Sequence, residues 1–120
     1  MGVDVRVLGV DPGVTRCRLA VVYIHAGRRV SLVDAAGART PKDAELGERL
    51  QQVEDAILGV IAECSPTAIA VEQVFSQHNV RTVIGTAQAA GVACLIAARQ
   101  GIPMAFHTPS EVKAAVTGSG

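Results

Sequence analysis

Short apolar runs separated by turn residues dominate the first third of this chain. Runs rich in Val, Ile and Leu at 5–10 and 19–24, and a third that begins at 30, have the length and composition typical of strands. The first run stops at Asp11-Pro12-Gly13, a strong turn sequence, and a Gly-Arg-Arg turn joins the second run to the third. The pattern predicts an antiparallel meander of three strands.

The next segment changes to helical spacing. Thr40-Pro41 has the residues of a helix N-cap and first helical position, and Pro66 is expected to stop the helix. Between them the apolar residues recur every three or four positions along one stripe, which predicts an amphipathic helix. These residues are Leu46, Leu50, Val53, Ile57, Ile61 and Cys64.

Strand and helix patterns then alternate. Short strands are predicted over 68–72 and 102–106, with a helix over 80–99 between them that ends at Gly101. A capping-box pattern opens a third helix at Thr108. The middle helix is expected to pack its small residues closely on the sheet, on another helix or on a second subunit. These small residues are Gly85, Ala87, Ala90, Gly91, Cys94 and Ala98.

This order of elements predicts an α/β fold. Three antiparallel strands are followed by two strands that helical crossovers make parallel, giving one mixed five-stranded sheet flanked by helices. At 120 residues the chain is expected to form a single domain over 1–120.

Composition narrows the classes of function. Basic and acidic residues balance at 11 each, so binding of nucleic acid would need a local basic patch. The three cysteines have no Cys-x-x-Cys spacing, which speaks against a disulfide framework or a zinc site. Because we see no signal-peptide pattern and no apolar stretch long enough for a bilayer, we expect a soluble cytoplasmic protein with no membrane partner.

Two carboxylates stand at the exits of predicted strands. Asp11 ends the first strand and Glu72 ends the fourth. If these strands are neighbours, the two acids meet at the sheet edge where α/β folds place ligand sites, and paired oxygen ligands favour Mg²⁺ or Mn²⁺. Each acid also has a structural alternative, because Asp11 can accept backbone hydrogen bonds in its turn and Glu72 can pair with an arginine.

Three further residues are candidates for contact with DNA. Phe75 follows Glu72 in a polar loop, where it either stacks on a base or packs onto the next helix. Arg81 and Lys113 are candidate phosphate contacts, although lone basic residues on helices are more often simply solvated.

Five motifs occur in order along the chain. They are Val-Leu-Gly-Val-Asp-Pro-Gly (7–13), Val-Glu-Gln-Val-Phe (71–75), Gln-His-Asn-Val (77–80), Gly-Thr-Ala-Gln-Ala-Ala-Gly (85–91) and His-Thr-Pro-Ser-Glu-Val-Lys (107–113). Together they resemble the bacterial RuvC family of Holliday-junction endonucleases over nearly the whole chain. The resemblance implies a ribonuclease H-like fold.

The resemblance also implies roles for single residues. Asp11 and Glu72 match catalytic carboxylates that bind Mg²⁺, with Mn²⁺ as an alternative. Phe75 matches an aromatic that stacks on bases, and Lys113 matches a basic residue near the active site. The implied activity is metal-dependent hydrolysis of phosphodiesters in four-way DNA junctions during recombination and repair, by a homodimer that works with a branch-migration helicase. Two bound metals would clamp the attacking and leaving oxygens.

The chain departs from the family in two respects. The family uses four acidic positions, of which the last two lie on a helix beyond the glycine-rich segment at 118–120. The resemblance therefore implies a domain that lacks the final helix and a 120-residue chain with little or no activity. Arg18 and Ala20 replace two expected glycines of the second strand, and Arg18 either points to solvent or lies near the DNA-binding face.

Two other classes of function remain open at this point. One is a non-catalytic module that binds junctions through Phe75, Arg81 and Lys113. The other is a phosphate-binding fragment of an actin-like ATPase, suggested by the Asp-Pro-Gly-Val-Thr turn at 11–15. Such ATPases need a second homologous domain to close on the nucleotide, and this length does not hold one.

Overall fold

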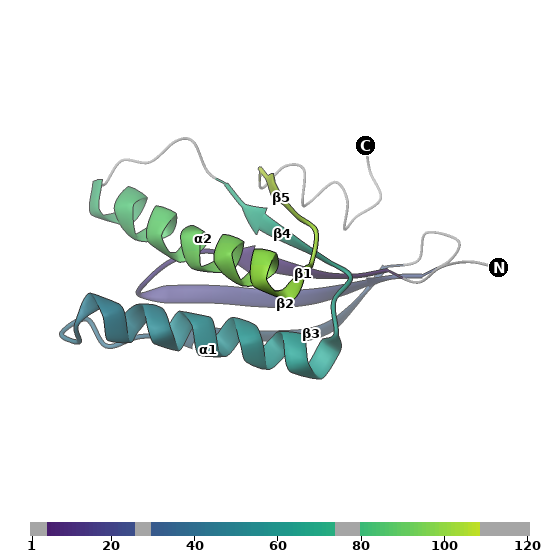
Figure 1. Cartoon of the computed structure of the whole chain (residues 1–120), viewed down its shortest axis with the longest axis horizontal. Helices are drawn as coiled ribbons and strands as arrows, with labels where there is room; N and C mark the ends of the chain where they lie inside the picture. The colour runs from purple at the N-terminus through teal and green to yellow at the C-terminus, as the bar shows by residue number, and fades with distance from the viewer. Residues whose placement is uncertain (1–4, 26–29, 74–79, 109–120) are drawn as a thin grey trace.

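The computed structural model describes residues 5–25, 30–73 and 80–108. Five strands and two helices make up this part of the chain (Figure 1). In order they are β1 (Val5–Asp11), β2 (Arg16–Ile24), β3 (Val30–Arg39), α1 (Leu46–Cys64), β4 (Ala68–Glu72), α2 (Val80–Gln100) and β5 (Met104–His107). The predicted helix that opens at Thr108 lies outside the described residues.

The strands form one mixed sheet in the order β3-β2-β1-β4-β5. The pairs β3–β2 and β2–β1 are antiparallel, whereas β1–β4 and β4–β5 are parallel. The predicted sheet is therefore confirmed, including the change from antiparallel to parallel pairing. Because the chain crosses from β3 through α1 to β4, the strand that ends at Glu72 lies directly beside the strand that ends at Asp11.

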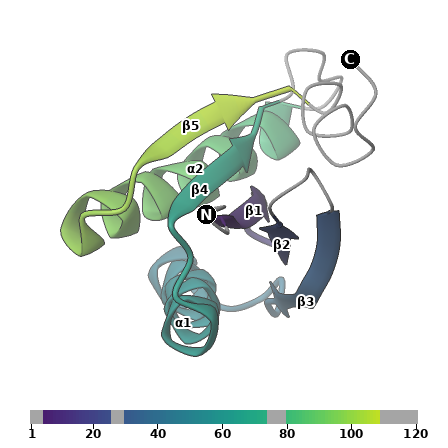
Figure 2. The same cartoon turned by 90° about the vertical axis from the view of Figure 1, so that its right-hand side faces the viewer.

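Both helices pack on the same face of the sheet (Figure 2). Alternate residues of the three central strands point to this face, and the register aligns them across the strands, with Leu8 beside Val21 and Ile69. They meet the apolar sides of α1 and α2, which contact each other. The core comprises Leu8, Val10, Cys17, Leu19, Val21, Val53, Ile57, Val60, Ile69, Val71, Ala89, Ala93, Ile96 and Ala97, with Val14 from the β1–β2 loop.

Two strand starts differ from the sequence prediction, and the third strand, for which only a start was predicted, is long. β2 begins at Arg16 rather than at 19, and β3 continues to Arg39 through an Ala- and Gly-rich segment of low strand propensity. Arg16 pairs with Arg39, so the ladder extends both strands because cross-strand pairing outweighs local preference. β5 begins at Met104, because the backbone amide of Ile102 is used to end α2.

The prediction that Thr40 caps the first helix is wrong. α1 begins at Leu46 after Glu45 in an extended conformation, and Thr40 lies in the preceding loop with only 3% of its surface exposed. Its hydroxyl is bonded to the β1–β2 loop instead of to a helix terminus. The C-terminal signals are confirmed, since Ser65 adopts a left-handed conformation and donates its N–H to the carbonyl of Ile61 just before Pro66.

α2 ends at Gly101 as the sequence predicted. Gly101 has φ +68, and the N–H of Ile102 donates to the carbonyl of Ala97 while that of Gly101 donates to Ala98, a Schellman arrangement. At 21 residues the helix is long and apolar enough to cross a membrane by length and composition alone, so the expectation that no apolar stretch has that length is wrong. Its inner side is buried in the core described above, as expected of a helix that packs on a sheet.

The predicted inner face of α2 is partly wrong. The residues buried against the sheet are Ala89, Ala93, Ile96 and Ala97. Ala87, Gly91 and Ala98, which were expected to face inward, are exposed. They continue an outward apolar line along the helix, which we call the outer stripe of α2. It consists of Val80, Ile84, Ala87, Gly91, Leu95 and Ala98, all exposed.

Cys17 is a core residue rather than a reactive thiol. Its side chain is completely buried, and burial raises the pKa of the thiol to about 11. A thiol with so high a pKa is almost entirely protonated near neutrality and is a poor nucleophile. This cysteine therefore acts as a small apolar group of the core.

Candidate metal and phosphate site

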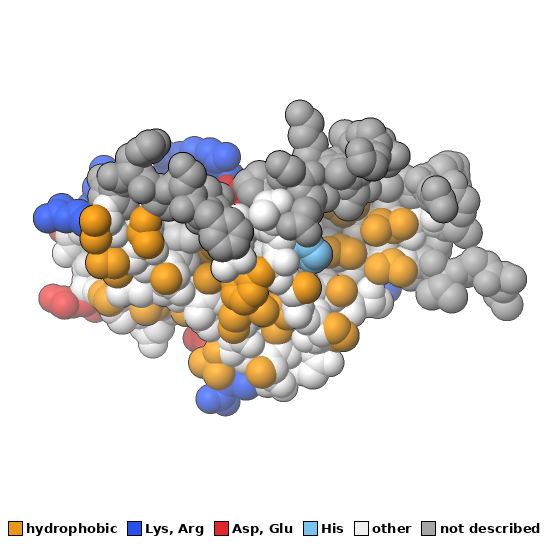
Figure 3. Space-filling view, turned by 90° about the horizontal axis from the view of Figure 1, so that it is seen from above, with side chains coloured by type: hydrophobic (Ala, Val, Ile, Leu, Met, Phe, Trp, Pro, Cys, Tyr) orange, Lys and Arg blue, Asp and Glu red, His pale blue; other side chains and the backbone are white. Residues whose placement is uncertain are grey.

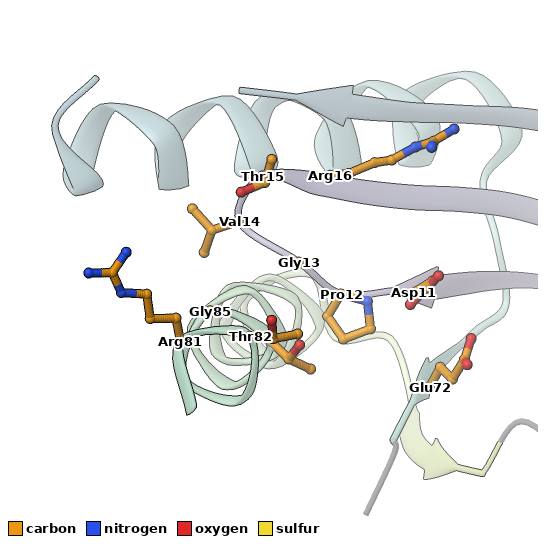
Figure 4. A pocket seen from close by; sticks show the side chains of 11 residues that line it. Asp11, Pro12, Gly13, Val14, Thr15, Arg16, Glu72, Arg81, Thr82 and Gly85 are labelled. Carbon is orange, nitrogen blue, oxygen red and sulfur yellow. The ribbon is translucent and has the colours of Figure 1, made fainter. Parts of the chain in front are cut away.

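Asp11 and Glu72 are the last residues of adjacent parallel strands. Val10 is the register partner of Val71, so the next residue of each strand, Asp11 and Glu72, stands at the same level of the sheet. Their carboxylates lie at neighbouring strand ends beside the same open space (Figure 4). The predicted convergence of these two acids is confirmed.

The two acids lie on the sheet face opposite the helices. Val10 and Val71 point into the core, and side chains alternate between faces along a strand, so Asp11 and Glu72 point the other way. The row next to them on this face is small, with Ala20, Gly9, Ala70 and Ala105 side by side on β2, β1, β4 and β5. Small neighbours leave the carboxylates accessible from outside the sheet.

A cavity of about 420 Å³ opens beside the acids. It lies between the β1–β2 loop and the first turns of α2 (Figure 4). Its lining combines the two carboxylates with two arginines and several hydroxyls, a set suited to a cation and a phosphate together. The lining residues are Asp11, Pro12, Gly13, Val14, Thr15, Arg16, Glu72, Arg81, Thr82, Gly85 and Thr86.

The β1–β2 loop needs glycine at its tightest point. A Cβ atom on Gly13 would fall on the carbonyl oxygen of Arg16, so no other residue fits this turn without a backbone shift. Val14 then turns into the core and packs near Gly85 of α2, where an added Cβ would be 3.7 Å from the Val14 side chain. The loop is thus fixed between Asp11 and the helix that forms the other wall.

Thr40 and Arg49 hold the same loop from the side of α1. The Thr40 hydroxyl donates to the carbonyl of Val14 at 2.6 Å and accepts from Nε of Arg49 at 2.9 Å. Nη2 of Arg49 donates to the hydroxyl of Thr15 at 2.9 Å, and the Thr40 N–H donates to the Thr15 carbonyl at 3.0 Å. These bonds tie the cavity wall to a helix, so it is positioned by regular structure.

Glu72 shows the electrostatic effect of its neighbours. The pKa of its carboxyl is raised from 4.5, first by burial and then by repulsion from Asp11, while the positive charge of Arg18 acts in the opposite direction. Like charges held this close disfavour ionisation. A cation placed between the two carboxylates would remove the repulsion.

The raised pKa makes a prediction for the Glu72→Gln variant. Ionising Glu72 is harder in the folded state than in the unfolded state, so its contribution to stability is present below pH 4.5 and is lost as the pH rises through the higher folded value. Without metal, the variant should therefore melt about 1–2 °C above the unsubstituted chain at pH 7, and the difference should vanish near pH 4.

Thermal melts followed by circular dichroism from pH 3.5 to 8 would measure this difference. Glu63→Gln, which removes an exposed carboxylate from α1, is the matched control for loss of one negative charge. A Glu72→Gln variant that melts lower than the unsubstituted chain at pH 7 would contradict the prediction.

The donor set fits a hard divalent cation bound partly by water. Both candidate ligands are carboxylates, and neither a thiolate nor an imidazole is among them. Mg²⁺ and Mn²⁺ prefer such oxygen ligands. Within residues 5–25, 30–73 and 80–108, no group of three or more acidic, histidine or cysteine side chains is gathered. Two carboxylates leave most coordination positions to water or to oxygens of a substrate, as is usual for Mg²⁺.

The other predicted site residues divide into two groups. Arg81 lies in the first turn of α2 and lines the cavity, as expected of a phosphate contact. Phe75 and Lys113 lie outside the described residues. Sequence reasoning missed Thr82 and Thr86 of the lining, although their spacing of four residues places both hydroxyls on one helix side next to Arg81.

The comparisons with known proteins agree with this geometry. The model of the family described as crossover junction endodeoxyribonuclease RuvC matches residues 7–120. A crossover junction endodeoxyribonuclease RuvC from Streptomyces avermitilis is 63% identical over 96% of this chain and 65% of its own length. The chain spans about three-fifths of the length of the curated relatives it matches.

Solved structures show the same fold. The RuvC of Thermus thermophilus in complex with Holliday junction substrate matches with a TM-score of 0.82 and 26% identity, over 93% of this chain and 71% of that one. The sheet and helices described above are therefore of the ribonuclease H-like type found in RuvC. An Aquifex aeolicus PPX-GPPA enzyme also matches, with a TM-score of 0.52 and 17% identity over 91% of this chain and 38% of that one, which shows the fold alone.

Proposed function

Because the chain belongs to the RuvC family of crossover junction endodeoxyribonucleases, we propose that it forms the strand-cleaving core of an enzyme that resolves four-way DNA junctions. The observation that carries the proposal is the meeting of Asp11 and Glu72 at one rim of a cavity with basic and hydroxyl groups on its other walls. Carboxylates for a cation and donors for phosphates are the two requirements of phosphodiester hydrolysis.

Asp11 and Glu72 would hold the divalent cation, Mg²⁺ or Mn²⁺, from adjacent strand ends. When bound there, the cation supplies Lewis-acid stabilisation of charge on the phosphate and lowers the pKa of a coordinated water. The rigid sheet fixes the spacing of the carboxylates, because both side chains leave paired strands rather than loops. The small row behind them lets a DNA strand approach this face.

Arg16, Arg81 and the hydroxyls of the cavity would position the DNA backbone. Phosphate contacts of this kind fix the register of the nucleic acid and carry little sequence information. They also meet the requirement set by the composition, since a chain with balanced charge must gather its basic groups locally. By the family resemblance, Phe75 would stack on a base and Lys113 would add a further basic contact.

We further propose that the enzyme acts as a homodimer joined through the outer stripe of α2. Hydrophobic side chains gather over α2 and β5 on the face seen in Figure 3, and Ile84 and Leu95 of the stripe are 51% and 50% exposed. Ala87 and Gly91 at its middle allow the close approach of a second helix. A two-fold dimer would present two sites to the two strands that must be cut. A branch-migration helicase remains the partner implied by the resemblance.

The test of the function is binding and cleavage of a synthetic four-way junction by the chain. Fluorescence anisotropy should give an affinity for the junction at least about tenfold above that for a duplex of the same length at equal salt. Nicking at the crossover with Mg²⁺ or Mn²⁺ supports the enzyme. Because the resemblance implies little or no cleavage by the 120-residue chain, junction-selective binding without nicking agrees with both the enzyme core and the non-catalytic module, whereas equal affinity for junction and duplex contradicts both.

A further inference from the structure

Arg18 lies in the same row of the sheet as the two acids. It is the register partner of Asp11 across the β1–β2 pair, and it alternates with the buried Cys17 and Leu19, so it shares the open face with the carboxylates. Glu72 stands on the far side of Asp11 and pairs with His107 of β5. One row thus runs through a guanidinium, two carboxylates and an imidazole on four neighbouring strands.

The surroundings of Arg18 leave its head group accessible. The register partner of Arg18 on β3 is Gly37, which has no side chain. The adjacent side chain in the row is therefore that of Asp11, on β1. The side chain of Arg18 is exposed. Its positive charge acts to lower the pKa of the carboxyl of Glu72, which lies one strand beyond Asp11. Arg18 is therefore solvent-accessible, and it lies on the sheet face that carries the two acids.

The net charge of the row indicates the role of Arg18. The two carboxylates and Arg18 together carry one negative charge, and one bound divalent cation would turn this into one positive charge. A single phosphodiester group carries one negative charge, so the row with one cation matches it. Without Arg18, the same cation would leave the row neutral and without net attraction for the phosphate.

We propose that Arg18 is a substrate-binding residue of the cleavage site, whose guanidinium binds a non-bridging oxygen of the phosphodiester held at Asp11 and Glu72. The inference rests on the proposed function and refines it. Arginine suits this role because its planar fork donates two parallel hydrogen bonds to a phosphate. The rival role is that of a counter-charge that only offsets the two acids.

The experiment compares Arg18→Gln and Arg18→Lys with the unsubstituted chain. Affinity for the four-way junction and for a short single-stranded oligonucleotide is measured by anisotropy with Mg²⁺ over a series of salt concentrations. Arg18→Gln should weaken both by about five- to tenfold and reduce the salt slope by about one ion. Arg18→Lys should recover most of the salt slope but only part of the affinity, because a point charge replaces the fork.

One further measurement and one control variant separate the two roles of Arg18. Mn²⁺ binding to the DNA-free chain, followed by electron paramagnetic resonance, should tighten about three- to tenfold in Arg18→Gln, since a repelling charge is gone. Arg99→Gln, at the far end of α2, makes the same charge change away from the acids and should alter neither property.

An unchanged DNA affinity and salt slope in Arg18→Gln, together with tighter Mn²⁺ binding, would overturn the proposal and leave Arg18 as a counter-charge. The oligonucleotide separates this failure from failure of the proposed function. If the chain does not prefer junctions but Arg18→Gln still weakens oligonucleotide binding, the proposed function in junction resolution is wrong. The proposal that Arg18 binds a phosphate is then still supported.

Discussion

Replacing Asp11 with asparagine is expected to lower the affinity of the chain for Mn²⁺ by about 10- to 100-fold and to remove any metal-dependent nicking of junction DNA that the unsubstituted chain shows. The asparagine side chain keeps nearly the same shape, so the β1–β2 turn should be preserved. It removes the negative charge at the strand end beside Glu72. A single remaining carboxylate binds a hard cation weakly, because water then supplies almost every ligand.

The measurement is Mn²⁺ titration by electron paramagnetic resonance, beside junction cleavage with the same preparation. Asp55→Asn is the matched control, since it makes the same substitution at an exposed position of α1. Glu72→Gln should weaken Mn²⁺ binding in the same way as Asp11→Asn, whereas Arg18→Gln should strengthen it. If Asp11→Asn binds Mn²⁺ as tightly as the unsubstituted chain does, the pair is not the metal site.

The second large effect is expected at the outer stripe of α2. Ile84→Glu should weaken self-association of the chain by at least about 100-fold, because an unpaired charge would be buried in the proposed helix–helix contact. Ile84 is 51% exposed and does not line the cavity, so the fold and the acidic pair should be preserved. The unsubstituted chain should sediment as a dimer at micromolar concentration and the variant as a monomer.

Sedimentation velocity over a concentration series would measure this change. Ala62→Glu places the same charge on an exposed position of α1 and should leave the dimer intact. A variant that still dimerises would show that a different surface joins the subunits. A chain that is monomeric with or without the substitution would end the proposal of a homodimer through α2.

One part of the candidate site could be recognised from the sequence, and another part could not. Asp11 and Glu72 are visible because each ends an apolar run, at the sheet edge where α/β folds place ligand sites. The clamp formed by Thr40 and Arg49 could not be recognised from the sequence, because its hydrogen bonds join residues that are 9 to 34 positions apart. Thr40-Pro41 resembles a helix start, and only the folded chain shows that its hydroxyl serves the β1–β2 loop.

The strands show the same division. β4 was predicted with its observed limits, because its five residues form an apolar run whose length and boundaries are local properties. Only the start of β3 was predicted, because its Ala- and Gly-rich end is held by pairing with β2 and has no strand signal of its own. Arg18 could be placed only after the register had set it opposite Asp11.

The sequence by itself determined the order of strands and helices, the acids at two strand exits and the family to which the chain belongs. These follow from periodicity, composition and local motifs, which act over a few neighbouring residues. Tertiary structure alone decided that β4 lies beside β1, that Arg18 joins the acids in one row, and that Ala87, Gly91 and Ala98 of α2 belong to an outward stripe. Such relations depend on the register and packing of distant segments, and no local pattern encodes them.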